Sequence, residues 1–165
     1  PETLRIAADG EVEVRGPALF LGYLEEDGAI RRPLTPDGWF QTGDLGYLDE
    51  TGNLCVTGRK DNLFISGGEN IQPEEIEAAL CALDAVARAV VVPVAGPVFG
   101  HRPVAFIEPA PGFALEPETL ARQLAERLPR YMIPAAWLPW PAEAAGAGLK
   151  PDRSVFRRIA EQTMR

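Results

Sequence analysis

The stretch GRKDNLFISGGENIQPEEIE, residues 58–77, decides the fold of this 165-residue chain. It begins with a glycine and two cations, passes through a short apolar run, reaches the Gly67-Gly68 pair, and ends in an acidic helix start. Pro73 suits the first turn of a helix, where its missing N–H removes no hydrogen bond, and glutamates favour the positive end of the helix dipole. The pattern therefore predicts a short strand, a glycine corner and a helix in immediate succession.

The residues before this stretch predict β structure. Apolar and polar residues alternate in EVEVR at 11–15, which predicts a half-buried strand, and ALFLGYL at 18–24 is a second apolar run. Residues 25–38 are polar and interrupted by glycine and proline, which predicts a loop. The sequence DETG at 49–52 separates two short apolar segments and predicts a hairpin turn.

The residues after it predict helices mixed with strands. Gln72 stands at the N-cap position of the first helix, whose inner face includes Ile76, Leu80 and Leu83 at helical spacing. Further elements are expected at 86–94 (a central strand), 102–108 (its partner), 119–128 (a helix), 136–140 (an edge strand) and 152–164 (a last helix, burying Val155, Phe156 and Ile159). Residues 141–148 are expected to form a flexible loop of small residues.

The chain is therefore predicted to have an α+β fold in two parts. Residues 1–59 are β-rich, and residues 60–165 form a small α+β domain that is large enough to fold by itself. The chain begins inside a strand pattern and without an initiator methionine, so we expect it to be part of a longer protein.

Charge and composition argue against several classes of partner. The net charge of −8 disfavours nucleic acid or an anionic membrane as the main partner. No apolar run reaches the roughly 18 residues of a membrane span, and the first residues do not resemble a signal peptide. Cys55, Cys81 and His101 form no disulfide framework or metal motif, so we expect no metal ligands among them and a reduced, cytoplasmic compartment.

Several polar and glycine residues stand out as candidates for a site. The carboxylate of Asp44, in QTGDLG, can accept hydrogen bonds from a diol, and Arg59 offers a planar fork of donors. Lys150 lies in the Gly/Ala-rich segment AGAGLKPDR and suits a point charge brought to an oxyanion or phosphate. Gly67-Gly68 would let a backbone approach a ligand closely.

Each candidate also has a simpler interpretation. Asp44 alone would cap a turn, Arg59 and Lys150 would be surface cations, and the glycine pair would form a tight turn. The arginines outside these motifs are expected to be surface or ion-pair residues: Arg102, Arg130 and Arg153.

Four segments, taken in order, resemble the C-terminal part of the adenylate-forming superfamily of acyl- and aryl-CoA synthetases, luciferases and peptide-synthetase adenylation domains. They are GEVEVRGPALFLGYL (10–24), GWFQTGDLGYLDETGNLCVTGRKDNLFISGGENIQPEEIE (38–77), LPRYMIP (128–134) and GLKPDR (148–153). The resemblance covers nearly the whole chain, and its long middle motif is highly specific. It implies that residues 1–59 end a large N-terminal domain and that residues 60–165 form a mobile C-terminal lid domain.

The resemblance implies a role for each candidate. Asp44 resembles the carboxylate that holds the ribose hydroxyls of ATP, and Arg59 resembles the arginine that contacts ribose and phosphate. Lys150 resembles the lysine that orients the substrate carboxylate during adenylation. Asp61 resembles the hinge, and the Ser66-Gly67-Gly68 segment resembles the loop that borders the pantetheine channel during thioester formation.

The family reaction has two steps in one site. A carboxylic acid and ATP give an acyl-adenylate and pyrophosphate, and the thiol of CoA then displaces AMP. ATP, Mg²⁺ and CoA are the implied cofactors and co-substrates, and the partner of the lid is the rest of the N-terminal domain. The phosphate loop, the acyl pocket and most contacts to Mg²⁺ lie upstream in the family, so we expect the isolated 165 residues to be inactive.

A narrower resemblance is to the o-succinylbenzoate–CoA ligases of menaquinone biosynthesis. It rests on SGGENIQPEEIE, on FGHRPVAF at 99–106, and on the Gly-Leu-Lys sequence at 148–150. Another aryl- or acyl-CoA synthetase, and an α+β binding module without catalysis, remain the alternative interpretations.

Overall fold

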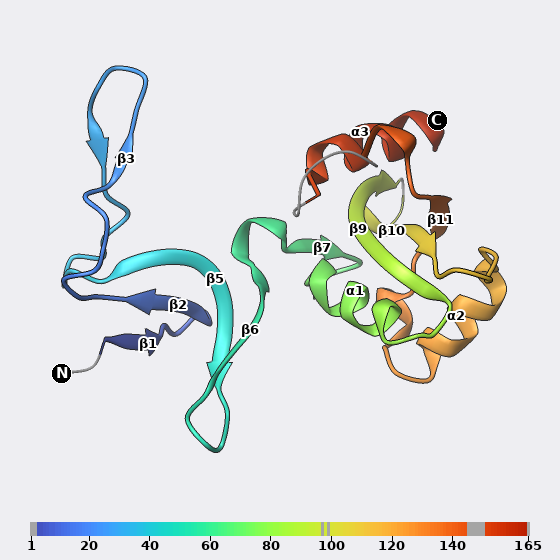
Figure 1. Ribbon diagram of the computed structural model, residues 1–165, viewed down its shortest axis with the longest axis horizontal. Helices are drawn as coiled ribbons and strands as arrows, with labels where there is room; N and C mark the ends of the chain where they lie inside the picture. Colours follow the sequence, from blue (N-terminus) through green and yellow to red (C-terminus); the bar gives the residue numbers. More distant parts are fainter. Residues whose placement is uncertain (1–2, 97, 99, 145–150, 165) are drawn as a thin grey trace. The chain divides into compact units, whose positions relative to one another are not determined.

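The computed structural model describes residues 3–96, 98, 100–144 and 151–164. The chain divides into two compact units, Pro1–Asp61 and Asn62–Arg165, each with a sheet of its own (Figure 1). Strands fill the first unit, and the second combines strands with three α-helices. The fold is therefore α+β, as predicted.

The first unit is built on an antiparallel sheet with the order β1-β2-β5-β6. Its strands are β1 (Leu4–Ile6), β2 (Glu11–Val14), β5 (Phe40–Leu48) and β6 (Leu54–Arg59). The predicted hairpin turn at 49–52 is confirmed. The Asp49 carboxylate accepts hydrogen bonds from the N–H groups of Thr51 and Asn53, both at 2.9 Å, and Gly52 has a φ of 84°.

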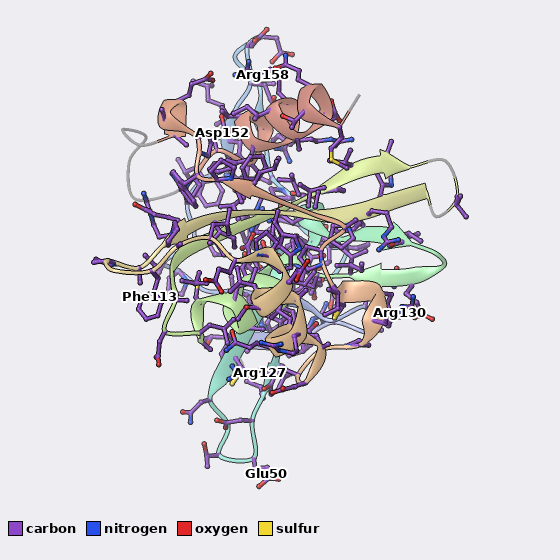
Figure 2. All side chains as sticks on the ribbon, turned by 90° about the vertical axis from the view of Figure 1, so that its right-hand side faces the viewer. Glu50, Phe113, Arg127, Arg130, Asp152 and Arg158 are labelled. Atoms are coloured by element: carbon purple, nitrogen blue, oxygen red, sulfur yellow. The ribbon has the colours of Figure 1, made fainter. Side chains whose placement is uncertain are left out.

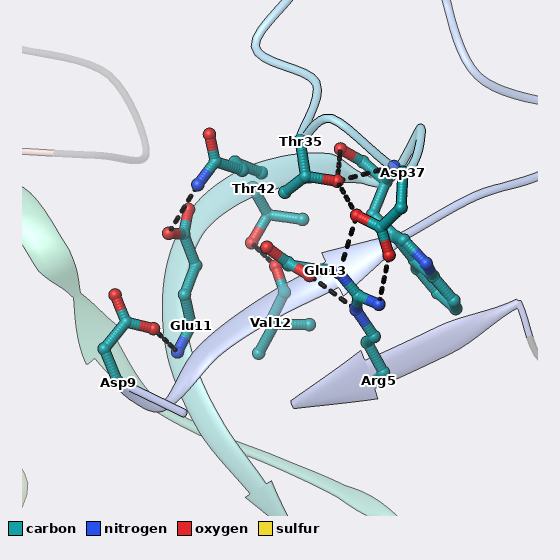
Figure 3. A network of polar contacts seen from close by, with 10 residues as sticks. Arg5, Asp9, Glu11, Val12, Glu13, Thr35, Asp37 and Thr42 are labelled. Atoms are coloured by element: carbon teal, nitrogen blue, oxygen red, sulfur yellow. Dashed lines mark hydrogen bonds and ion pairs between the residues drawn. The ribbon is translucent and has the colours of Figure 1, made fainter. Parts of the chain in front are cut away.

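The prediction of a half-buried strand at 11–15 is wrong in one respect. Glu11 and Glu13 are 3% exposed, as little as Val12 between them. Arg5 Nε donates to Glu13 at 2.6 Å, and Lys60 Nζ donates to Glu11 at 2.8 Å (Figure 3 shows the first of these). The alternation in the sequence thus reflects buried carboxylates with cationic partners, because a paired carboxylate can be buried where a lone one cannot.

The predicted loop at 25–38 contains a strand. Strands β3 (Tyr23–Leu24) and β4 (Ile30–Arg31) pair as a separate two-stranded ribbon. The turn between them is closed by Asp27, whose carboxylate accepts the Ala29 N–H at 2.9 Å, and by Gly28 with a φ of 80°. The polar residues of this segment therefore make a hairpin turn, which the loop interpretation missed.

The second unit has a mixed sheet centred on β10 (Gly100–Pro109). Strand β10 pairs antiparallel with β9 (Val86–Gly96) and with β7 (Phe64–Ser66), and parallel with β11 (Ala136–Pro139). Strand β8 (Glu69–Ile71) pairs with β7. The prediction that residues 86–94 form the central strand is thus wrong, since in the described part of the chain β9 pairs with β10 alone.

The free edge of β9 is closed by side chains. The Val91 N–H donates to Glu77 at 2.6 Å, and the Val91 carbonyl accepts from Arg153 at 2.8 Å. Strand β9 is rich in valine because both of its faces are buried. Val91 packs in the cluster with α1 (Pro73–Cys81) and α2 (Pro117–Ala125), while Val90 and Val92 pack in the cluster with α3 (Arg153–Thr163). Figure 2 shows the sheet between these helix layers.

The helix boundaries differ slightly from those predicted. Helix α2 was predicted at 119–128 and runs from Pro117 to Ala125. It begins two residues earlier than predicted because Pro117 is well suited to the first turn of a helix. Helix α3 begins at Arg153, and the Asp152 side chain caps it by accepting the Ser154 N–H at 2.9 Å. Gln72 precedes α1 without a side-chain cap hydrogen bond.

Short 3₁₀ turns complete the path of the chain. They lie at Lys60–Asn62, Arg130–Met132 and Ala142–Ala144. The last falls in the predicted flexible loop, whose remaining residues 145–148 lie outside the described part of the chain. Among the described helices, none has the length and apolar character needed to cross a membrane.

A polar cluster around Arg5 holds the Asp37 carboxylate. Arg5 donates to Asp37 at 2.7 Å, and its guanidinium lies 4.5 Å from the centroid of the Trp39 ring (Figure 3). The hydrogen bonds from Arg5 and Thr35 lower the pKa of Asp37 from its ordinary 3.8 to about 2. The ionised carboxylate stabilises the folded unit fully above the unfolded pKa, and this contribution disappears as pH falls through the folded pKa.

We therefore expect the free energy of unfolding of the first unit to decrease from about pH 4 to about pH 2. Urea unfolding at several pH values, followed by Trp39 fluorescence with Trp137→Phe and Trp140→Phe, measures it. Asp37→Asn should flatten the slope in this window. An unchanged slope in Asp37→Asn would show that Asp37 does not carry the effect.

Candidate functional site

Asp44 and Arg59 lie opposite each other on paired strands. They are register partners on β5 and β6, and Arg59 Nη1 lies 3.1 Å from Asp44 Oδ1. The same Nη1 donates to the Thr42 carbonyl at 2.9 Å. Both side chains are 39% exposed, so a ligand can reach the carboxylate while the guanidinium is held in place.

The turn before Asp44 is fixed by each residue of the Thr-Gly-Asp sequence. The Thr42 hydroxyl donates to the Val12 carbonyl at 2.7 Å and accepts the Asp44 N–H at 3.0 Å. Gly43 has a φ of 73°, and a Cβ there would lie 2.7 Å from Arg59 Nη2. The positive φ thus favours glycine here, and any larger residue would also displace the Arg59 guanidinium that covers it.

The sequence did not indicate that Lys60 belongs to this region. Its Nζ donates to Asp9 at 2.6 Å and to the buried Glu11 at 2.8 Å, and Glu11 also accepts the Gly43 N–H at 2.9 Å. These hydrogen bonds raise the pKa of Lys60 and lower that of Asp9. Asp9 and Glu11 are two residues apart, which is the spacing of side chains on the solvent-facing side of a strand. Nothing local in the sequence could therefore have revealed their contact with Lys60.

Asp61 is the last residue of the first unit. Its side chain is 83% exposed, and its carboxylate lies 3.6 Å from Arg59 Nη2. Lys60 before it is tied to the first unit, while the Asn62 side chain after it donates to Glu74 on α1. The contacts described for its neighbours thus change from one unit to the other across this single residue.

The Ser66-Gly67-Gly68 segment forms the tight turn between β7 and β8. Ser66 pairs with Glu69 across it, and the two glycines have φ values of 60° and 90°. Two consecutive positive φ angles are those of a type I′ hairpin turn, which glycine adopts without strain. A Cβ at Gly68 would meet no atom within 4 Å, so space beside this turn is open.

A hollow of about 520 Å³ lies beside this turn. Its lining consists of Ser66, Gly67, Glu69, Arg102, Arg130 and Tyr131. The sequence interpretation treated its two arginines by default as surface or ion-pair residues. Both arginines line the same hollow, and Arg130 belongs to the LPRYMIP segment already singled out.

Two further expectations concern Lys150 and metal binding. Lys150 lies outside the described residues, and α3 begins three positions after it. Within the residues that the structure describes, no group of three or more His, Cys, Asp or Glu side chains could hold a metal ion.

Comparison with known proteins follows the same motifs. Residues 75–141 match the AMP-binding enzyme C-terminal domain family. The 2-succinylbenzoate–CoA ligase of Salmonella typhimurium is 41% identical over 150 residues, which are 91% of this chain and 32% of that protein. A Mycobacterium tuberculosis ligase that is named for a propanoyl group bearing an octahydro-indene ring system is also similar. It is 38% identical over 152 residues, which are 90% of this chain and 30% of that protein.

Solved structures give the same result. An arginine-to-lysine variant of Escherichia coli MenE with bound OSB-AMS matches 97% of this chain and 34% of its own, with a TM-score of 0.85 and 35% identity. ATP-bound MatB from Rhodopseudomonas palustris matches 94% of this chain and 31% of its own, with a TM-score of 0.81 and 27% identity. The chain spans about a third of the length of the relatives it matches. It belongs to the adenylate-forming superfamily, of which it carries the C-terminal portion.

Proposed function

We propose that this chain is the C-terminal part of an ATP-dependent acid–CoA ligase, which adenylates a carboxylic acid and then forms its CoA thioester. The observation that carries the proposal is the Asp44–Arg59 pair, held on two paired strands directly before the boundary between two compact units. A reachable carboxylate beside a fixed guanidinium suits a ribose diol next to a phosphate. Residues 1–59 would end the large domain, and residues 60–165 would be its mobile lid.

In the adenylation step, the chain supplies charge and orientation. Asp44 would accept the ribose hydroxyls of ATP, and Arg59 would contact ribose and phosphate. The Asp61 carboxylate lies 3.6 Å from Arg59 Nη2, which is too far for a good hydrogen bond. A phosphate oxygen could therefore replace the Asp61 carboxylate as the partner of Arg59. Lys150 would orient the acid and neutralise charge as it develops. Mg²⁺ would enter with ATP and be held mainly by residues upstream of this chain.

In the thioester step, the second unit would present a different surface. Rotation at Asp61 would bring the Ser66-Gly67-Gly68 turn to the large domain, where it borders the pantetheine arm of CoA. The hollow beside this turn supports the proposal, because guanidinium groups bind phosphates and CoA carries several. The thiol would then displace AMP from the adenylate.

We propose o-succinylbenzoate as the acid and the cytoplasm as the compartment. The 2-succinylbenzoate–CoA ligase of Listeria innocua supports this substrate, with 47% identity over 113 residues that cover 68% of this chain and 24% of that protein. A different acyl-CoA ligase is the second candidate, because the Mycobacterium tuberculosis relative is almost as similar.

ATP–pyrophosphate exchange by the full-length enzyme tests both candidates. The panel should include o-succinylbenzoate, benzoate, malonate and a ring-bearing propanoate. We expect exchange with o-succinylbenzoate to exceed that with the other acids at least about 10-fold, since a pocket that fits its aromatic ring and pairs its second carboxylate rejects acids that lack either group. A preference for another acid would support the second candidate, and no exchange with any acid would contradict the ligase proposal.

A further inference from the structure

Arg153, the first residue of α3, makes the most extensive set of charged contacts in the described part of the second unit. Its Nη1 and Nη2 donate to the two carboxylate oxygens of Glu77 at 2.6 and 2.7 Å, which is a bidentate pair. Nη2 also donates to Glu74 at 3.1 Å, and Nη1 donates to the Val91 carbonyl at 2.8 Å. The guanidinium is thus fixed in position and in orientation.

These contacts close the edge of β9 at Val91, but the ion pair itself is poorly explained by stability alone. Arg153 places a cation in the first turn of a helix, where the helix dipole opposes it. Its side chain is 26% exposed and that of Glu77 is 15% exposed, so both charges lose hydration, and burial raises the pKa of Glu77. Shielded ion pairs of this kind are often replaced by apolar residues without loss of stability. What the pair provides is defined geometry.

The pair joins segments that are far apart in the chain. Glu77 also accepts the Val91 N–H at 2.6 Å, so α1, β9 and the start of α3 meet at one point. Glu74 also accepts from the side chain of Asn62, the first residue of the second unit. The residue after the proposed hinge and the residue that begins α3 are therefore bound to the same carboxylate.

We propose that Arg153 is a positioning residue for adenylation. Through Glu74 and Glu77 it locks the start of α3 to the segment that follows the hinge, so that rotation at Asp61 carries the chain at Lys150 to a defined place. The inference rests on the proposed function, because it assigns to Arg153 the placement of a lysine that the ligase reaction needs. The turn at 66–68 itself is held by the pairing of β7 with β8 and with β10, to which Arg153 and Glu77 do not contribute, so thioester formation should depend on Arg153 much less than adenylation does.

The test compares both half-reactions in the full-length enzyme. Arg153→Met should lower ATP–pyrophosphate exchange about 10- to 100-fold, because small misplacement of a catalytic group is costly. Thioester formation from preformed acyl-adenylate and CoA should change less than about threefold. Arg153→Lys should give an intermediate loss, since it keeps the charge without the bidentate fork. The matched control is Arg157→Met on the same helix, which removes an exposed pair with Glu161 and should leave both rates unchanged.

A second variant separates positioning from folding. Glu77→Leu with Arg153→Met removes both charges of this pair, although the Val91 N–H and carbonyl lose these partners, so its melting temperature should be no lower than that of Arg153→Met while adenylation stays low. Recovery of adenylation in this double variant, equal loss of both half-reactions in Arg153→Met, or no loss at all would overturn the inference. Lys150→Ala in the same assay distinguishes the two proposals. If that variant loses adenylation while Arg153→Met does not, only this inference fails, whereas full adenylation by Lys150→Ala removes the role that the proposed function assigns to Lys150 and, with it, this inference.

Discussion

Lys150→Ala in the full-length enzyme is expected to lower adenylation by about 10²- to 10³-fold, because it removes a cation from the charge that develops as the acid attacks ATP. Thioester formation from preformed acyl-adenylate should stay within about threefold of the wild type, since this step would be served by the turn at 66–68 instead. ATP–pyrophosphate exchange measures the first step, and single-turnover formation of the thioester measures the second.

The chain offers a conservative control for this prediction. Lys150→Arg keeps the charge but replaces a compact ammonium by a planar fork, so part of the adenylation rate should return. The chain has two lysines, Lys60 and Lys150, and Lys60 is engaged with Asp9 and Glu11. Adenylation that is unaffected in Lys150→Ala would refute the role assigned to Lys150, whereas a wild-type protein that adenylates no acid would favour a binding module without catalysis over the ligase.

Gly68→Ala is expected to show the opposite division between the two steps. A methyl group at Gly68 meets no atom of the chain within 4 Å, so it would occupy the space that we assign to the pantetheine arm. Thioester formation should fall about 10- to 100-fold, with adenylation within about threefold of the wild type, because misplacing the attacking thiol affects the second step. The same two assays give the result.

The matched control is Gly112→Ala in the same unit. Gly112 has a φ of 88°, close to the 90° of Gly68, and its Cβ would also meet nothing within 4 Å. The two variants therefore carry a similar backbone strain of about 1–2 kcal/mol. Thioester formation reduced equally by both, or by neither, would refute the role of the turn as a channel wall.

Local signals in the sequence explain the parts of the fold that were predicted correctly. Pro73 marks the start of α1, and the residues at 49–52 mark the β5–β6 hairpin. Asp152 lies one residue from the start of α3, which it caps. Each of these signals acts within four residues, where turn and capping chemistry decide the backbone.

The errors concern contacts made over long distances in the chain. Strand β9 has the composition of a central strand because both of its faces are buried, yet its edge is closed by Glu77 and Arg153 rather than by a strand. Glu11 and Glu13 are buried because Arg5 and Lys60 reach them. The amino-acid composition of a strand indicates that its side chains are buried, but it does not indicate which residues elsewhere in the chain bury them.

The candidate site shows the same limit at closer range. The hairpin register pairs Leu48 with Leu54, and its regular continuation would place Asp44 opposite Gly58. A shift between Leu45 and Gly46 brings Asp44 opposite Arg59 instead. Both residues were expected at the nucleotide site from the family resemblance, but their direct contact was not, and the bulge that creates it depends on Gly46, whose Cβ would lie 2.7 Å from the Cys55 carbonyl.

The central claim is that the second unit pivots at Asp61 to serve two reactions. Pulsed electron–electron double resonance on the full-length enzyme tests it directly. The spin labels are placed at Glu50→Cys on the β5–β6 turn and at Ala78→Cys on α1, and Cys55 and Cys81 are replaced by serine. We predict two distance populations whose ratio shifts between ATP with acid and an acyl-adenylate analogue with CoA. A single distance distribution that no ligand changes would contradict the account.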